Sequence, residues 1–141
     1  MSTHQELAGF IWSVADLLRG DYKQSEYGKV ILPLTVLRRL DCVMEPTREA
    51  VWALDDKLTF SHKDQMLKIE AKLPFYNTSK QNFRTIGDDP GNVEKNLVDF
   101  INGFSANARE IVDKYEFHTQ ITRLRSGKLL YPVVQIGRAH V

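Results

Sequence analysis

The sequence predicts an all-α protein built as a multi-helix bundle, and three observations support this fold class. Apolar residues recur with the 3.6-residue period of a helix through most of the chain, helix-capping residues precede several of these segments, and no segment alternates as a strand would. The chain has 141 residues, of which 43% are hydrophobic and 26% are charged. This composition is typical of one globular domain.

Composition also argues against several classes of protein. No run of 18 apolar residues occurs, and Met1–Glu6 is not a basic segment leading into an apolar one, so neither a membrane span nor a secretory signal is expected. The single Cys42 cannot form an intrachain disulfide, and no cysteine or histidine spacing is typical of a metal site. We therefore expect a cytoplasmic protein. Its net charge of +1 provides no large field to attract nucleic acid.

The first helix is predicted from a capping box, Thr3-x-x-Glu6, whose side chains can satisfy free backbone N–H groups at a helix start. Gly20 is the expected stop. Trp12 lies at the edge of the apolar face, where it either covers a neighbouring helix or anchors a partner. The face itself comprises Leu7, Phe10, Ile11, Val14, Leu17 and Leu18.

The second helix, over residues 26–45, is apolar nearly all round, with Ile31, Leu34 and Cys42 outside its main stripe. The main stripe comprises Val30, Leu32, Val36, Leu37, Leu40, Val43 and Met44. Such a helix is normally central in a bundle or covered by another surface. Pro33 removes one backbone N–H, so it predicts either a bend or the start of the regular part of the helix, and we expect a kink near Leu32.

Shorter helices are predicted in the rest of the chain. Thr47 caps a helix that ends near Leu58, and Ser61 and Asp64 begin another that ends near Leu73. Later helices have apolar positions at Val93, Leu97, Phe100, Ile101 and Phe104, then at Ala108, Ile111, Val112 and Tyr115, then at Phe117, Ile121 and Leu124, and finally at Leu129, Leu130, Val133 and Val134.

Four punctuating residues separate these later helices. Asp89 is the expected cap of the first, with Pro90 at a position where its missing N–H costs nothing. Gly103 is expected to close that helix, and Ser105 to cap the next.

Residues 74–91 lose the helical period, and the segment from Phe75 to Arg84 mixes aromatic, amide, hydroxyl and basic side chains. Aromatic rings that stack on bases, beside groups that reach phosphate oxygens, would suit nucleic-acid contact. A connecting loop whose aromatic residues fill the core would have the same composition. Both interpretations stay open at this stage.

No sequence pattern predicts catalysis. The chain has no glycine-rich phosphate loop, no nucleophile elbow, no HExxH motif and no constellation of paired carboxylates. We therefore assign no catalytic, cofactor-binding or metal-binding residue.

Four segments resemble a known family. They are FIWSVADLLRG (residues 10–20), YGKVILPLTVLRRLD (27–41), FYNTS (75–79) and NLxxFINGFS (96–105). Together they resemble the N-terminal helical domain of the modification, HsdM-type, subunit of type I restriction-modification systems. The resemblance extends from about Leu7 to Gln135.

The resemblance implies a DNA methyltransferase context. In that family the helical domain precedes a catalytic domain that binds S-adenosylmethionine and methylates N6 of a flipped adenine. Two modification subunits join one specificity subunit, and the helical domain helps to close the complex around double-stranded DNA. The catalytic and cofactor motifs are not in this sequence. S-adenosylmethionine is therefore expected for the full-length family protein, and this chain alone should be inactive.

Five basic residues are our candidates for DNA contact: Lys29, Arg38, Arg39, Lys80 and Arg84. Phosphate contacts need flexible positive side chains on an exposed arc or loop. Arg38 and Arg39 stand about 100° apart on a helix, so they cannot both address one surface point.

An alternative function is a pure protein-interaction domain, which would dock on the specificity or restriction subunit without touching DNA. The over-apolar helix around Ile31, Leu34 and Cys42 favours it, because such a helix needs a covering surface.

The end of the chain departs from the family pattern. Pro132 is expected to interrupt a helix that should continue toward a catalytic domain. The last six residues, IGRAHV, are what the codons ATC-GGA-AGA-GCA-CAC-GTC would encode. This nucleotide string resembles a common sequencing adapter. We therefore expect a helical domain over residues 1–135, truncated before the catalytic domain, and a non-native tail over residues 136–141.

Overall fold

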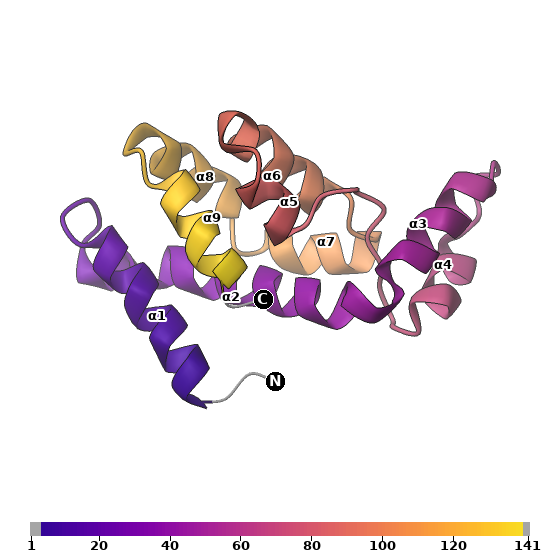
Figure 1. Cartoon of the computed structure of the whole chain (residues 1–141), viewed down its shortest axis with the longest axis horizontal. Coiled ribbons are helices and arrows are strands. Elements are labelled where there is room, and N and C mark those ends of the chain that lie inside the picture. The colour runs from indigo at the N-terminus through magenta and orange to yellow at the C-terminus, as the bar shows by residue number, and fades with distance from the viewer. Residues whose placement is uncertain (1–3, 140–141) are drawn as a thin grey trace.

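A computed structural model of the chain describes residues 4–139, which form helices and short 3-10 turns and contain no extended strand (Figure 1). The all-α prediction is confirmed. Thr3 of the predicted capping box and the last two residues of the predicted tail lie outside the described residues. The helices are α1 (His4–Leu18), α2 (Gly28–Met44), α3 (Arg48–Lys57), α4 (Asp64–Ala71), α5 (Phe83–Gly87), α6 (Val93–Asn102), α7 (Ala106–Asp113), α8 (Phe117–Ser126) and α9 (Leu130–Ala139).

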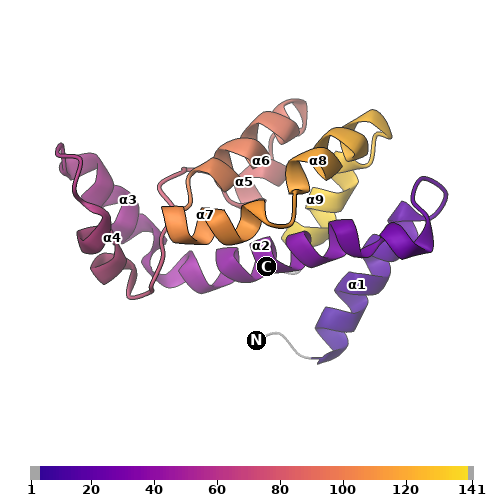
Figure 2. The same ribbon diagram turned by 180° about the vertical axis from the view of Figure 1, so that it is seen from behind.

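Helix α2 runs along the molecule and contacts α1, α7, α8 and α9, as Figure 1 and Figure 2 show from opposite sides. The central position predicted for this helix is confirmed, but its packed face differs from the predicted one. Leu34 is fully buried, whereas Leu32 is 58% exposed. The chain's own helices therefore cover part of the surface that was expected to need a partner.

Pro33 lies inside α2, five residues after its first residue. The proposal that it marks the start of the regular helix is therefore wrong. Its missing N–H leaves one carbonyl of the preceding turn without the usual helical donor. Near it, the Thr35 hydroxyl donates to the Ile31 carbonyl at 2.6 Å.

Two apolar clusters hold the described residues together. The main core joins α1, α2, α5, α6, α7, α8 and α9, and its largest buried side chains include Phe10, Phe83, Phe100 and Phe117. A second, small cluster lies between α3 and α4 and consists of Val51, Leu67 and Ala71. The α3–α4 pair therefore forms an arm that extends beyond the main body, at the right of Figure 1.

Pro132 lies in the first turn of α9, which begins at Leu130. The expected interruption at Pro132 is therefore wrong, because the N–H groups of a first helical turn have no intrahelical partner to lose.

Residues 136–139 of the predicted tail continue α9. A Cβ atom added to Gly137 would lie 2.8 Å from the Phe83 ring, so α9 and α5 approach closely there. Arg138 pairs with Asp88 at 2.6 Å. These contacts do not test where the native sequence ends, so the origin of the tail stays a prediction.

The turn after α1 is fastened to α8. Gly20 has a φ of +100°, a left-handed conformation that favours glycine, and α1 ends near it as predicted. Beyond the turn, the Arg123 Nη1 atom lies 2.9 Å from Glu26 Oε2, and its guanidinium lies 3.8 Å from the centre of the Tyr22 ring. The Tyr22 hydroxyl in turn donates to Gln120 at 2.9 Å.

The hydrogen bonds from Arg123 lower the pKa of Glu26 from 4.5 to about 2. Because the folded-state pKa is depressed, the ionised carboxylate stabilises the fold above about pH 4.5, and this contribution is lost as the pH falls toward 2. We expect Glu26→Gln to melt below the wild type at pH 7 and to approach it below pH 3. Melting followed by circular dichroism from pH 2 to 7 measures this, and a constant difference would contradict it.

Candidate nucleic-acid interface

The loop before α5 and the turn after α6 lie against each other in a short antiparallel pairing. The Thr78 N–H donates to the Gly103 carbonyl at 2.9 Å, and the Ser105 N–H donates to the Tyr76 carbonyl at 2.8 Å. The loop that carries Lys80 is therefore bonded to the C-terminal end of α6 through its own backbone.

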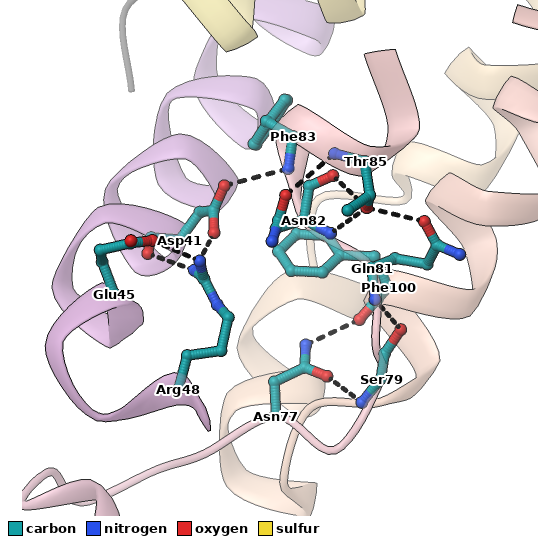
Figure 3. Close-up of polar contacts among 10 residues, drawn as sticks. All are labelled: Asp41, Glu45, Arg48, Asn77, Ser79, Gln81, Asn82, Phe83, Thr85 and Phe100. Atoms are coloured by element: carbon teal, nitrogen blue, oxygen red, sulfur yellow. Dashed lines mark hydrogen bonds and ion pairs between the residues drawn. The ribbon is translucent and has the colours of Figure 1, made fainter. Parts of the chain in front are cut away.

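Side chains strengthen this pairing, as Figure 3 shows for Asn77, Ser79 and Phe100. The buried Asn77 amide donates to the Phe100 carbonyl at 2.8 Å, and its Oδ1 accepts the Ser79 N–H at 2.7 Å. The Ser79 hydroxyl donates to Asp99 at 2.7 Å. The buried Phe100 carbonyl and Ser79 N–H are therefore both hydrogen-bonded, which avoids the free-energy cost of burying them unpaired.

Gly103 ends α6, as the sequence predicted, but the reason is a close approach rather than a left-handed turn. Its φ is −80°, which any residue can adopt. A Cβ atom there would lie 2.7 Å from the Ser79 backbone nitrogen and 2.6 Å from its Cβ, and would also meet the Asn77 side chain. The position therefore requires a residue without a side chain.

We predict that Gly103→Ala destabilises the chain by about 2 kcal/mol, the usual cost of forcing an extra methyl group into a packed site. The clash is with backbone, which cannot move aside as a flexible side chain can. Urea denaturation measures the change. Gly91→Ala is the control, because a Cβ at Gly91 meets no atom within 4 Å; equal losses for the two variants would contradict the prediction.

The start of α5 is capped by a reciprocal pair of hydrogen bonds. The Thr85 N–H donates to Asn82 Oδ1 at 3.0 Å, and the Asn82 N–H donates to the Thr85 hydroxyl at 2.9 Å. The next N–H, that of Phe83, donates to Asp41 Oδ2 at 3.1 Å. These bonds satisfy donors that a helix start leaves free, and they fix the backbone that carries Arg84.

Asp41 links α2, α3 and α5, as Figure 3 shows. Its side chain is 1% exposed and forms an ion pair with Arg48, which also donates to the Asp41 carbonyl at 2.7 Å and pairs with Glu45 at 2.5 Å. Burial raises the pKa of Asp41, while Arg48 and the Phe83 N–H favour the ionised form. Because it has both partners, the buried carboxylate can hold three helices in place.

Replacing Asp41 by alanine should destabilise the chain by roughly 3–5 kcal/mol, because it leaves the Arg48 charge without its buried partner. The matched control is Asp56→Ala, which removes an exposed carboxylate that pairs with Lys80 at 3.2 Å. That change should cost less than about 1 kcal/mol. Chemical denaturation compares the two variants, and similar losses would show that Asp41 has no special structural role.

The aromatic residues of the loop are used for packing. Phe83 is fully buried and meets Phe100 edge to face, with the ring centres 6.1 Å apart. Phe75 packs against the main core, and the Tyr76 hydroxyl donates to Asp64 at 2.6 Å. The expectation that an aromatic residue of this segment fills the core is therefore confirmed for Phe83, although Phe83 lies on α5 and not in a loop. Its buried ring cannot stack on a base in this arrangement.

Arg38 differs from the other four basic candidates because it is buried, with 5% exposure. Its guanidinium lies 5.1 Å from the centre of the Phe10 ring. Arg39, the next residue, is exposed, so the two arginines do address different surroundings, as predicted. A buried guanidinium that faces α1 does not favour phosphate contact by Arg38.

The four exposed candidates do not form one cluster. Lys29 and Arg39 are ten residues apart on α2, or about 15 Å along its axis. Lys80 lies in the loop and Arg84 on α5. The Lys80 ammonium is already engaged, since it pairs with Asp56 at 3.2 Å and lies 5.1 Å from the centre of the Trp52 ring.

Sequence reasoning missed the residues that position this region. Asp41 lies on α2 and Arg48 begins α3, with a 3-10 turn between them, so no helical spacing joins the pair. The three-residue spacing of Glu45 and Arg48 was the available local signal. The contact between Trp52 and Lys80 could not be predicted, because the two residues are 28 positions apart and no sequence pattern connects them.

No group of three potential metal ligands occurs among residues 4–139, and no helix there is long and apolar enough to cross a membrane. A cavity between α3, α4 and the loop has a volume of about 10 Å³, which holds about one water molecule.

Comparison with known proteins gives one finding. A family model described as the HsdM N-terminal domain matches residues 7–136, which is nearly the whole chain. No curated protein and no solved structure matches the chain.

Proposed function

This chain belongs to the HsdM N-terminal domain family, and we propose that it contributes to DNA clamping and subunit assembly in a type I restriction-modification methyltransferase. One observation carries the proposal for DNA. Arg84 is exposed and has no ion pair among the described residues, yet its backbone is fixed by the capped start of α5. A cation that is fixed at its base and mobile at its tip suits contact with a phosphate.

Lys29 and Arg39 supply the same chemistry on α2, and Lys80 supplies it on the loop if the phosphate displaces Asp56. An arginine can donate two parallel hydrogen bonds to one phosphate, whereas a lysine acts as a point charge. These contacts are sequence-independent. They would hold the duplex without reading its bases.

The proposed partners are double-stranded DNA, a specificity subunit and a second modification subunit. Family membership implies S-adenosylmethionine for the full-length protein, and the cofactor would supply the methyl group. The family's cofactor motif is not in this sequence, so we assign none of its residues to the cofactor. The role proposed for this chain is to bind and orient, and the chain alone should not methylate DNA.

A second candidate function is docking on a partner subunit without DNA contact, and α1 favours it. Trp12 is 69% exposed and Ile11 is 38% exposed, and with Ala8 and Ala15 they follow helical spacing on one side of α1. Packing of Trp12 against a neighbouring helix, the simpler expectation, is therefore not observed. The unpartnered apolar face lies here rather than around Leu34.

The test of DNA contact is the double variant Arg39→Gln/Arg84→Gln in the assembled complex. Each lost phosphate contact should reduce the slope of log affinity against log salt by about 0.9, so the slope should fall by about 2. The control is Lys57→Gln/Lys114→Gln, which removes two exposed charges elsewhere. Fluorescence anisotropy with a labelled duplex measures both, and equal slopes would rule out these two contacts.

A further inference from the structure

A groove between the start of α6 and the turn that joins α8 to α9 gathers basic side chains from separate segments. Its volume is about 440 Å³, and it is lined by Lys95 of α6, Arg125 of α8 and Lys128 of the following turn. The aromatic ring of Tyr131, which is 40% exposed, also lines it. None of these four residues was a candidate from the sequence, because Lys95 is 30 positions from Arg125.

The charge in this groove is positive. Glu94 is the carboxylate among its lining residues, and it pairs with Arg125 at 3.0 Å. Lys95 and Lys128 are exposed and have no ion pair with any residue in the range 4–139. The neighbouring Asp89 is engaged with amides, since it accepts hydrogen bonds from Asn92 and Asn96.

The backbone around these cations is fixed. The Lys128 N–H donates to the Arg125 carbonyl at 3.0 Å, and the Leu129 N–H donates to the Leu124 carbonyl at 2.8 Å. Across the groove, Lys95 lies in the first turn of α6, whose cap residue Asn92 makes no side-chain hydrogen bond to the helix start. The positive end of this helix therefore adds to the field of the lysines.

We propose that this groove binds a phosphodiester group of the DNA backbone. The inference rests on the proposed function and adds a second contact surface, separate from Arg39 and Arg84. Lys95 and Lys128 neutralise the phosphate, and Tyr131, which also lines the groove, carries a hydroxyl that can donate a hydrogen bond to an oxygen. The two lysines act as point charges, which suit the compact oxygens of a phosphate. A planar carboxylate would be matched better by the two parallel donors of an arginine.

The first test is Lys95→Gln/Lys128→Gln in the assembled complex, measured by anisotropy with a labelled 20-base-pair duplex between 50 and 200 mM salt. Two lost phosphate contacts should reduce the salt slope by about 2. Lys57→Gln/Lys114→Gln removes the same charge from outside the groove and should leave the slope within about 0.5 of wild type. All four lysines are exposed, so these variants should fold.

In the second test the salt slope is expected to become steeper. Glu94→Gln removes the carboxylate that holds Arg125, so it should free the guanidinium for the phosphate and steepen the salt slope by about 1. Glu110→Gln, on exposed α7 surface, is the matched control. Unchanged affinity for Glu94→Gln would count against the groove.

The outcomes separate this inference from the proposed function. If Arg39→Gln/Arg84→Gln lowers the slope and Lys95→Gln/Lys128→Gln matches its control, the groove proposal is overturned and DNA contact stands. Absence of duplex binding by the wild type overturns both. Competition by polyglutamate as effective as that by unlabelled duplex would indicate an acidic protein surface. Full displacement by inorganic phosphate at constant ionic strength would indicate a free-anion site, and either result overturns the proposal.

Discussion

The buried Asp41 carboxylate is the interaction on which the rest of the arrangement depends. It receives Arg48 from the start of the α3–α4 arm and the Phe83 N–H from the start of α5, while its own backbone belongs to the central helix. A carboxylate at 1% exposure is tolerated only when such partners replace water. The arm has just a small apolar cluster of its own, so this polar junction is a main part of its attachment.

The loop between the arm and α5 is fixed in turn by contacts with the end of α6. Asn77 and Ser79 bond it to the end of α6, and Gly103 lets the two backbones approach. The segments FYNTS and NLxxFINGFS, which resemble the family most clearly in this half of the chain, are thus the two sides of one contact. Their residue types are explained by packing and hydrogen bonding, and the candidate side chains for DNA contact are those left exposed around them.

The sequence predicted most of the helices because amphipathic periodicity is a local pattern, although the predicted caps Thr47 and Ser105 form no side-chain cap hydrogen bond and α5 lies within the segment expected to lose the helical period. It failed where the outcome depends on partners distant in the chain. Around α2 nearly every side is apolar, so the pattern could not tell that Leu34 would be buried and Leu32 exposed. The sequence placed Arg38 among the surface cations, but in the structure its guanidinium packs over the Phe10 ring of α1. The groove cations come from segments about 30 positions apart, and no local pattern joins them.

The charge count shows why composition could not locate a candidate surface for binding anions. The net charge of +1 sums over the whole chain, but in physiological salt a charge is screened over about 8 Å. A phosphate therefore responds to the few groups around it. Asp56 cancels Lys80, and Glu94 cancels Arg125, whereas Lys95 and Lys128 share a groove with no second carboxylate among its lining residues. Local pairing, rather than net charge, decides where this nearly neutral domain can attract an anion.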